Sequence, residues 1–330
     1  MAEIKTFGKR IELIVYSKGK DNEIDIALNA TGLRVDFNLN NTTQYNRGTF
    51  SIYNLNPEVI KQLSSGEKYV SLQVGMHGSD LATVGNDFYI SNATTETILP
   101  NTITTLYCIS GNRRTFLEKQ LNASYEGSTL EDDIKMIVAL AKESKIKVEY
   151  LLFPDYILKH KTYDAKTHRI SASIENTLKR LSIMYHFQYF MKGDLLRIVY
   201  KADSAKSYSD SIEGREPKEF SIDVLNIKAN PIVGVGTMTL DLNLAPNIFP
   251  GDVFDTENFI TASNDVGLEY LTAVSGDIKS TVTKYSKFQV WNVVHRGSNY
   301  TAEWNTIVQS FTARDGNRVS TNRLNWYGRS

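Results

Sequence analysis

The side chains that most often carry catalysis or bind metals are scattered along this 330-residue chain rather than gathered in motifs. The histidines stand far apart, and none forms a His-Glu-x-x-His pair or another spacing typical of a metal site. They are His77, His160, His168, His186 and His295. A Gly-x-Ser-x-Gly nucleophile elbow is also missing from the sequence. The sequence therefore predicts no catalytic residue, no metal site and no cofactor.

Three short patterns resemble fragments of active sites, but each has a simpler structural interpretation. Gly234-Val-Gly236 lacks the third glycine and the following helix of a dinucleotide loop, which favours a strand of small residues. Glu131-Asp132-Asp133 falls in the first turn of an expected helix, where acidic side chains suit the helix dipole. Cys108, the single cysteine, lies in an alternating run and is expected to be a buried small hydrophobe.

Charge and hydropathy narrow the class of protein. The 37 basic residues balance the 37 acidic ones, which argues against a general nucleic-acid or membrane-surface binder. The sequence has no secretory signal and no apolar run near the roughly 20 residues of a membrane helix. We therefore expect no membrane anchor and synthesis in a reducing compartment. A length of 330 residues predicts two or three domains.

Residues 1–118 show the period-two alternation of strands, as at Ile11, Leu13 and Val15. The same alternation recurs near residues 33–37, 50–54, 70–74, 88–90 and 102–109. Asn56-Pro57-Glu58 supplies an N-cap, an N1 proline and a first-turn acid, and so predicts a short helix that ends near Gly66. Short strands with one small helix predict a closed or nearly closed antiparallel barrel.

Residues 119–205 have the pattern of an α+β domain. Ser128-Thr-Leu-Glu131 resembles a capping box ahead of a helix that reaches about Ser144. A short strand is expected near Val148, and a second helix is expected at about 173–185. A hairpin follows at 187–200 with its turn at 192–194. The polar, Ser-rich residues 201–216 are predicted to be a connector.

Residues 206–330 predict a second barrel with a segment of low periodicity inserted at about 255–286. Pro250-Gly251 predicts a sharp turn before a new strand. Residues 288–306 predict a hairpin whose turn is Arg296-Gly297-Ser298-Asn299, because Gly and Asn tolerate positive φ. Its return strand carries Trp304, Thr306 and Val308 on one face.

Two residues of this hairpin have alternative interpretations. His295 is expected to hydrogen-bond the hairpin backbone rather than to bind a ligand. Trp304 is expected to pack in the core of the second barrel against the Phe288 strand, rather than to form a sugar platform. The arginine-rich end of the chain is either a frayed terminus or a docking arm. Its arginines are Arg314, Arg318, Arg323 and Arg329.

Taken together, these stretches resemble the trimeric T4-like baseplate hub proteins of phage tails, a family related to the N-terminal hub part of type VI secretion spike proteins. The resemblance rests on Asn54, Pro57, Gly66, Pro250, Gly251, Asp252, His295, Gly297, Asn299, Trp304 and Thr306. It implies a mainly β fold in which two similar antiparallel β-barrels, 1–118 and 206–330, flank a two-helix α+β domain, 119–205.

The resemblance also implies a function. Such a chain is a structural virion protein, not an enzyme, and its homotrimer forms a pseudo-sixfold ring that joins the hexameric tail tube to the spike or needle. Its other partners are the tape-measure protein and neighbouring baseplate proteins, with DNA only in transit. It is assembled in the host cytoplasm, and its spike is expected to be a separate protein. The alternative is a carbohydrate-binding module of a tail or cell-surface protein. A peptidoglycan-cleaving tail enzyme would need a carboxylate pair or metal site.

Overall fold

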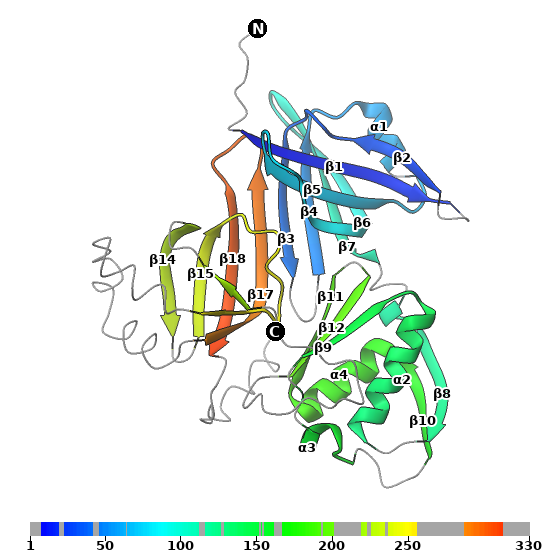
Figure 1. The fold of residues 1–330 in the computed structure, drawn as a ribbon. Coiled ribbons are helices and arrows are strands. Elements are labelled where there is room, and N and C mark those ends of the chain that lie inside the picture. Colours follow the sequence, from blue (N-terminus) through cyan, green and yellow to red (C-terminus); the bar gives the residue numbers. More distant parts are fainter. Residues whose placement is uncertain are drawn as a thin grey trace, which may run out of the picture.

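The computed structural model describes residues 8–19, 23–41, 46–63, 65–111, 116–126, 129–151, 153, 155–161, 167–192, 194–200, 219–222, 226–234, 237–255 and 287–312. The expected connector, most of the inserted segment and the arginine-rich end lie outside these ranges. The fold is mainly antiparallel β, which confirms the predicted fold class. An α+β unit separates two β-rich units in sequence and lies below their strands in Figure 1.

The described part of the first β unit includes seven strands and the helix α1. They are β1 (Lys9–Lys18), β2 (Ile24–Asn29), β3 (Val35–Asn41), β4 (Asn46–Tyr53), α1 (Pro57–Leu63), β5 (Tyr69–Met76), β6 (Ala82–Ile98) and β7 (Asn101–Ser110). The alternation read from the sequence places Leu13, Val15, Phe50 and Ile52 in one buried core, as expected. Asn56 Oδ1 accepts the Glu58 N–H at 2.9 Å and so begins α1.

The middle unit packs helices against a small sheet. Its elements are β8 (Gln120–Glu126), α2 (Leu130–Glu143), β9 (Lys147–Leu151), α3 (Asp155–Leu158), β10 (Thr167–Ser173), α4 (Ile174–Tyr185), β11 (Phe187–Lys192) and β12 (Leu195–Tyr200). The two predicted helices and the β11–β12 hairpin are present. The antiparallel pair β8–β10 was not predicted, and β9 joins β12 in parallel.

The cap of α2 lies one residue further along the chain than the sequence suggested. Thr129 is the N-cap, its Oγ1 accepts the Asp132 N–H at 3.3 Å, and Asp132 Oδ2 accepts the Thr129 N–H at 3.0 Å. The predicted Ser128–Glu131 pair is therefore wrong. Glu131 instead forms an ion pair with Lys135 one turn later, at 2.9 Å.

The second β unit is built around a long hairpin. Its strands are β13 (Glu219–Ser221), β14 (Ile227–Gly234), β15 (Thr237–Asn243), β16 (Val253–Asp255), β17 (Lys287–Ser298) and β18 (Trp304–Thr312). β17 continues through Ser298, with a register shift between Val290 and Asn292, and pairs Gly297 with Trp304. The predicted turn at 296–299 is therefore wrong, because the chain reverses at 299–303.

The two β units share one continuous sheet of 13 strands. Its main path is β14-β15-β18-β17-β3-β4-β7-β6-β5-β1-β2. β17 of the second unit pairs with β3 of the first over six residue pairs, from Val293–Asn41 to Ser298–Asp36. The expected barrels are not closed within the described strands, because the outer edge of β3 hydrogen-bonds to β17 instead of to a strand of its own unit.

The described residues form four hydrophobic clusters: one core in each unit and a small cluster of Phe190, Val199 and Phe249 between the middle unit and the second β unit. The largest residues of the first unit's core come from β1 to β7, and the second unit's core gathers Phe254, Phe288 and Val290. The core of the middle unit lies between α2, α4 and the sheet of β9, β11 and β12 (Figure 1). Each unit therefore has apolar packing of its own, and residues at the borders set the units against one another.

The corrected cap of α2 gives a direct test. Thr129→Ala removes the hydroxyl that accepts the Asp132 N–H, so thermal unfolding followed by circular dichroism should show a loss of about 1 kcal/mol, the usual value of an N-cap. Glu131→Ala removes the acid that the sequence suggested for the cap, along with an ion pair in which the Lys135 side chain is 49% exposed, and should lower the melting temperature less than Thr129→Ala does. The reverse ranking of the two variants would restore the cap that the sequence suggested.

Candidate functional site

The seam between β3 and β17 brings the hairpin motif against the first β unit. Gly297 lies inside β17, paired with Phe37 on one side and Trp304 on the other. A Cβ atom at this position would lie 2.6 Å from Phe37 Cε1 and 2.9 Å from Trp304 Cε3. Glycine is therefore required by the close approach of two aromatic rings, and not by the turn conformation that the sequence suggested.

Trp304 belongs to the seam and not to the core of the second unit, where we expected it. Its half-buried ring packs against the core of the first unit and meets Phe37 edge-on, with ring centroids 6.2 Å apart. Lys9 Nζ lies 5.4 Å from the Trp304 ring centroid and donates to Thr301 O at 2.6 Å. Burial and the nearby Lys228 lower the pKa of Lys9. The ring thus links the start of β1 to the end of the hairpin.

Asn299 extends the seam beyond the last strand pair. Its side-chain Oδ1 accepts the Val35 N–H at 3.0 Å, and its Nδ2 donates to Leu33 O at 2.7 Å. The Asn299 side chain is buried and satisfies two backbone groups at the start of β3. The Asn299 side chain therefore takes the place of a neighbouring strand's backbone beside β3. The turn propensity of asparagine does not suggest this role.

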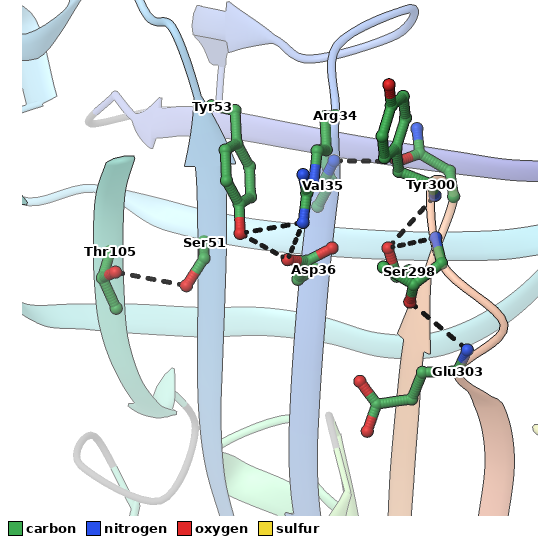
Figure 2. A network of polar contacts seen from close by, with 11 residues as sticks. Arg34, Val35, Asp36, Ser51, Tyr53, Thr105, Ser298, Tyr300 and Glu303 are labelled. Carbon is green, nitrogen blue, oxygen red and sulfur yellow. Dashed lines mark hydrogen bonds and ion pairs between the residues drawn. The ribbon is translucent and has the colours of Figure 1, made fainter. Parts of the chain in front are cut away.

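A partly buried arginine lies over this end of the seam (Figure 2). The Arg34 guanidinium carbon lies 3.9 Å from the centroid of Tyr53 and 4.8 Å from that of Tyr300. Arg34 Nη2 donates to the Tyr53 hydroxyl at 3.2 Å, and that hydroxyl donates to Asp36 Oδ2 at 2.8 Å. Burial, together with the hydrogen bond to Asp36, raises the pKa of Tyr53. The cluster connects β3, β4 and the β17–β18 loop.

His295 and Thr306 form a buried polar pair in the hairpin, two residues along each strand from the Gly297–Trp304 pair. His295 Nδ1 lies 3.0 Å from Thr306 Oγ1, which also accepts the Ala245 N–H at 2.8 Å. Both side chains are fully buried. The histidine thus contacts a side-chain hydroxyl on the paired strand, and its expected hydrogen bond to the hairpin backbone stays a prediction. The threonine ties the chain after β15 to β18.

A second joint connects the middle unit to the second β unit. Arg197 of β12 donates from Nη1 to Asp252 Oδ1 at 3.0 Å and to Pro250 O at 2.9 Å, while its Nε donates to Glu149 Oε2 at 3.0 Å. Arg197 is 4% exposed and Asp252 is 2% exposed. Sequence reasoning missed Arg197, although a single arginine among the apolar residues of Leu195–Tyr200 was a usable signal.

The turn at 249–252 positions the Asp252 carboxylate that accepts the hydrogen bond from Arg197. Gly251 has φ +95°, in the left-handed region that favours glycine. Asp252 Oδ2 accepts the Phe249 N–H at 2.9 Å, and the Gly251 N–H donates to Val290 O at 2.7 Å. The Pro250-Gly251-Asp252 segment therefore fixes one carboxylate oxygen within its own turn and directs the other to Arg197.

Asn54 organises the far end of the first unit. It has φ +58°, accepts the Thr102 N–H at 3.0 Å and donates from Nδ2 to Asn101 Oδ1 at 3.0 Å. Pro57 is the first residue of α1, and Gly66 has φ +71° in the segment that leads to β5. These three motif residues shape one unit internally and take no part in either joint.

The described residues hold no cluster of three or more His, Cys, Asp or Glu side chains that could bind a metal ion. Cys108 is buried, and burial raises the pKa of its thiol. Among the helices that the structure describes, none is both long and apolar enough to cross a membrane. Asp252, Gly297, Asn299 and Trp304 lie at joints between units, and the side-chain polar atoms of Asp252 and Asn299 bind partners in another unit.

Gly297→Ala tests the close approach at the seam. The added methyl group must displace an aromatic ring, so we expect a loss of about 1–3 kcal/mol, typical of overpacking. Phe37→Leu removes the nearer ring atoms, and in that background the cost of Gly297→Ala should be smaller in a double-mutant cycle. Gly19→Ala is the control, because its Cβ would meet ordinary contacts at 3.6 Å. Equal melting temperatures for Gly297→Ala and Gly19→Ala would contradict the seam geometry.

Arg197→Met tests the second joint. The substitution leaves the Asp252 carboxylate buried without its cation, and breaking a buried ion pair in this way costs about 3–5 kcal/mol. Lys147→Met is the matched control, because Lys147 and Asp194 form an ion pair 3.4 Å long whose side chains are mostly exposed. Calorimetry should show a lowered melting temperature for Arg197→Met alone. An unchanged melting temperature would show that the joint does not stabilise the fold.

Neither a protein-family model nor a curated protein matches this sequence. Several solved structures align with most of this chain at low sequence identity. The 43 kDa tail protein of prophage MuSo2 from Shewanella oneidensis is 8% identical, with a TM-score of 0.48 over 92% of this chain and 98% of that one. A tail protein from Neisseria meningitidis is 10% identical, with a TM-score of 0.46 over 92% and 96%. A chain of the Francisella PdpA–VgrG complex is 8% identical, with a TM-score of 0.49 over 92% of this chain and 58% of that one. These matches are to two tail proteins and to a complex that contains VgrG.

Proposed function

We propose that this chain is the central hub protein of a phage tail tip or baseplate, a structural protein whose three copies form a ring between the hexameric tail tube and the spike. The observation that carries the proposal is the pairing of β3 with β17, which joins two β-rich units edge to edge in one sheet. The residues that gave the sequence its resemblance to hub proteins include those that build this seam: Gly297, Asn299 and Trp304.

A ring that connects two large assemblies must keep its units in fixed positions. Backbone hydrogen bonds across the seam, the Phe37–Trp304 contact and the two hydrogen bonds of the Asn299 side chain oppose bending between the β units. If each copy presents the units 1–118 and 206–330 side by side, three copies present six similar surfaces. Such a ring meets a sixfold tube without an adaptor, which is the physical advantage of the arrangement.

The remaining partners follow from this position in the tail. The spike or needle attaches below the ring, the tape-measure protein and then DNA pass through its lumen, and other baseplate proteins surround it. The middle unit, 119–205, is held to the second β unit by the buried Arg197–Asp252 pair and provides an outer surface for such neighbours. A net charge of zero is compatible with a lumen that does not retain the genome. The mature protein is located in the virion.

The carbohydrate-binding alternative gains no support from Trp304. A sugar platform needs an open aromatic face, and this ring is half-buried, with Phe37 at its edge and the Lys9 ammonium over it. Trp304 instead has the surroundings of a residue that joins two β units.

Electron cryomicroscopy of assembled tails tests the proposed function. A bulky fusion at a terminus of this chain marks its position, and we expect three copies around the axis where tube and spike meet. A particle that carries the fusion on another tail protein of known position serves as the control for label density. Density in the tail fibres, or any number of copies other than three per tail, would contradict the proposal.

A further inference from the structure

The hairpin formed by β6 and β7 reaches beyond the strands on both sides of it. β5 pairs with β6 no nearer to the tip than Tyr89, and β4 pairs with β7 only as far as Ile103. The last pair of the hairpin, Ile98–Asn101, has no further strand beside it in the described part of the chain. The middle unit follows the other end of β7, so the tip and the middle unit lie at opposite ends of this hairpin (Figure 1).

Two large aliphatic side chains form the tip. Leu99 is 87% exposed and Ile98 is 56% exposed. A single exposed aliphatic residue is ordinary on a protein surface, but two adjacent ones on a projecting tip can enter a concave surface that a flat sheet cannot reach. Burial of this pair in an apolar pocket of a partner would remove its area from water and favour binding.

Asn54 holds the base of the tip in place. Its backbone N–H donates to Thr102 O at 2.8 Å, and its Oδ1 accepts the Thr102 N–H at 3.0 Å. Its Nδ2 donates to Asn101 Oδ1 at 3.0 Å. A tip that is fixed before binding loses little conformational freedom when a partner covers it, so this clamp favours association.

A cation lies beside the hairpin at the same end of the sheet. Arg34 stacks on Tyr53, which is the β4 residue paired nearest to the tip. Within the described part of the chain, the Arg34 guanidinium donates hydrogen bonds only from Nη2, to Tyr53 and Asp36. The Arg34 side chain is 29% exposed, and Nη1 keeps its donors for a carboxylate of a partner.

Both β units contribute to this end of the sheet. Tyr300, whose ring also lies against Arg34, belongs to the β17–β18 loop of the second unit and is 43% exposed (Figure 2). Under the proposed function, the hexameric tube must meet the two β units of each copy in similar ways. The tail tube is therefore the neighbour that fits this end, where loops of both units lie side by side.

We infer that the β6–β7 tip and Arg34 form a surface that docks the tail tube. Ile98 and Leu99 enter an apolar pocket of a tube subunit, and Arg34 faces a carboxylate of the same subunit. The inference rests on the proposed function and adds to it the residues that contact one neighbour.

Leu99→Asp tests the docking in phage that carry the variant. A charged side chain does not enter an apolar pocket, so the fraction of tail tips with a tube, counted in electron micrographs, should fall at least about tenfold. Leu99→Met keeps an apolar side chain and should assemble like the parent chain. Ile183→Asp is the second control, because Ile183 is 57% exposed on α4 of the middle unit. Purified Leu99→Asp should keep the parent melting temperature, since the side chain is almost fully exposed.

A second measurement identifies the partner directly in assembled tails. A photo-crosslinking amino acid placed at position 99 should link this chain to tube subunits, which mass spectrometry of the linked peptides identifies. The same amino acid at position 183 should give no link to the tube.

The outcomes separate the docking from the hub function. Links from position 99 to tube subunits, with loss of tubes in Leu99→Asp alone, support the docking. Tails with three copies at the tip would overturn it, and leave the hub function standing, if position 99 links to the spike, to another protein or to nothing. Leu99→Asp tips that carry tubes as often as the parent would overturn it as well. Tails without this chain at the tip would overturn the hub function itself.

Discussion

The pairing of β3 with β17 is the constraint on which the rest of the structure depends. Those two strands lie more than 250 residues apart in sequence, and their hydrogen bonds merge two β units into one sheet. The pairing also uses the edge of β3 that a closed barrel would need for its own closure. It brings Gly297 so close to Phe37 that any side chain at this position must displace an aromatic ring, and it sets Trp304 against the first core.

The motif residues fall into three groups once the seam is known. Gly297, Asn299 and Trp304 join the two β units, whereas Asp252 receives the buried arginine of the middle unit. Asn54 instead stabilises one unit from within, through Asn101 and Thr102. The short turn at Pro250-Gly251 is thus more than a chain reversal, because it holds a carboxylate in a dry position where a guanidinium can reach it. These joints hold the three units against one another, as the proposed position between tail tube and spike requires.

Local patterns predicted much of the fold, and long-range pairing explains what they missed. Alternation at Leu13 and Val15 and the N-cap at Asn56 specify nearby structure, because their effects depend on neighbouring residues. An asparagine at position 299 suits a turn, but its amide side chain can equally hydrogen-bond the backbone of another strand. Which of the two occurs depends on Leu33 and Val35, far away in sequence. Arg197 could be noticed in an apolar strand, but its partner Asp252 lies in another unit. The α2 cap was displaced by one residue because Ser128-Thr129 offers two hydroxyls with acids at matching spacing.

Amide hydrogen exchange resolved to single residues on β3 and β17 tests most directly whether the two β units form one body. If they do, the seam amides, such as that of Val35, should exchange with the same free energy of opening as the amides of β4 in the first unit and β18 in the second. Asn299→Ala should lower the protection of the Val35 amide while leaving β7 unchanged. Seam amides that exchange by a separate, low-energy opening while both units stay protected would contradict it, because the β units would then be two bodies joined by a hinge.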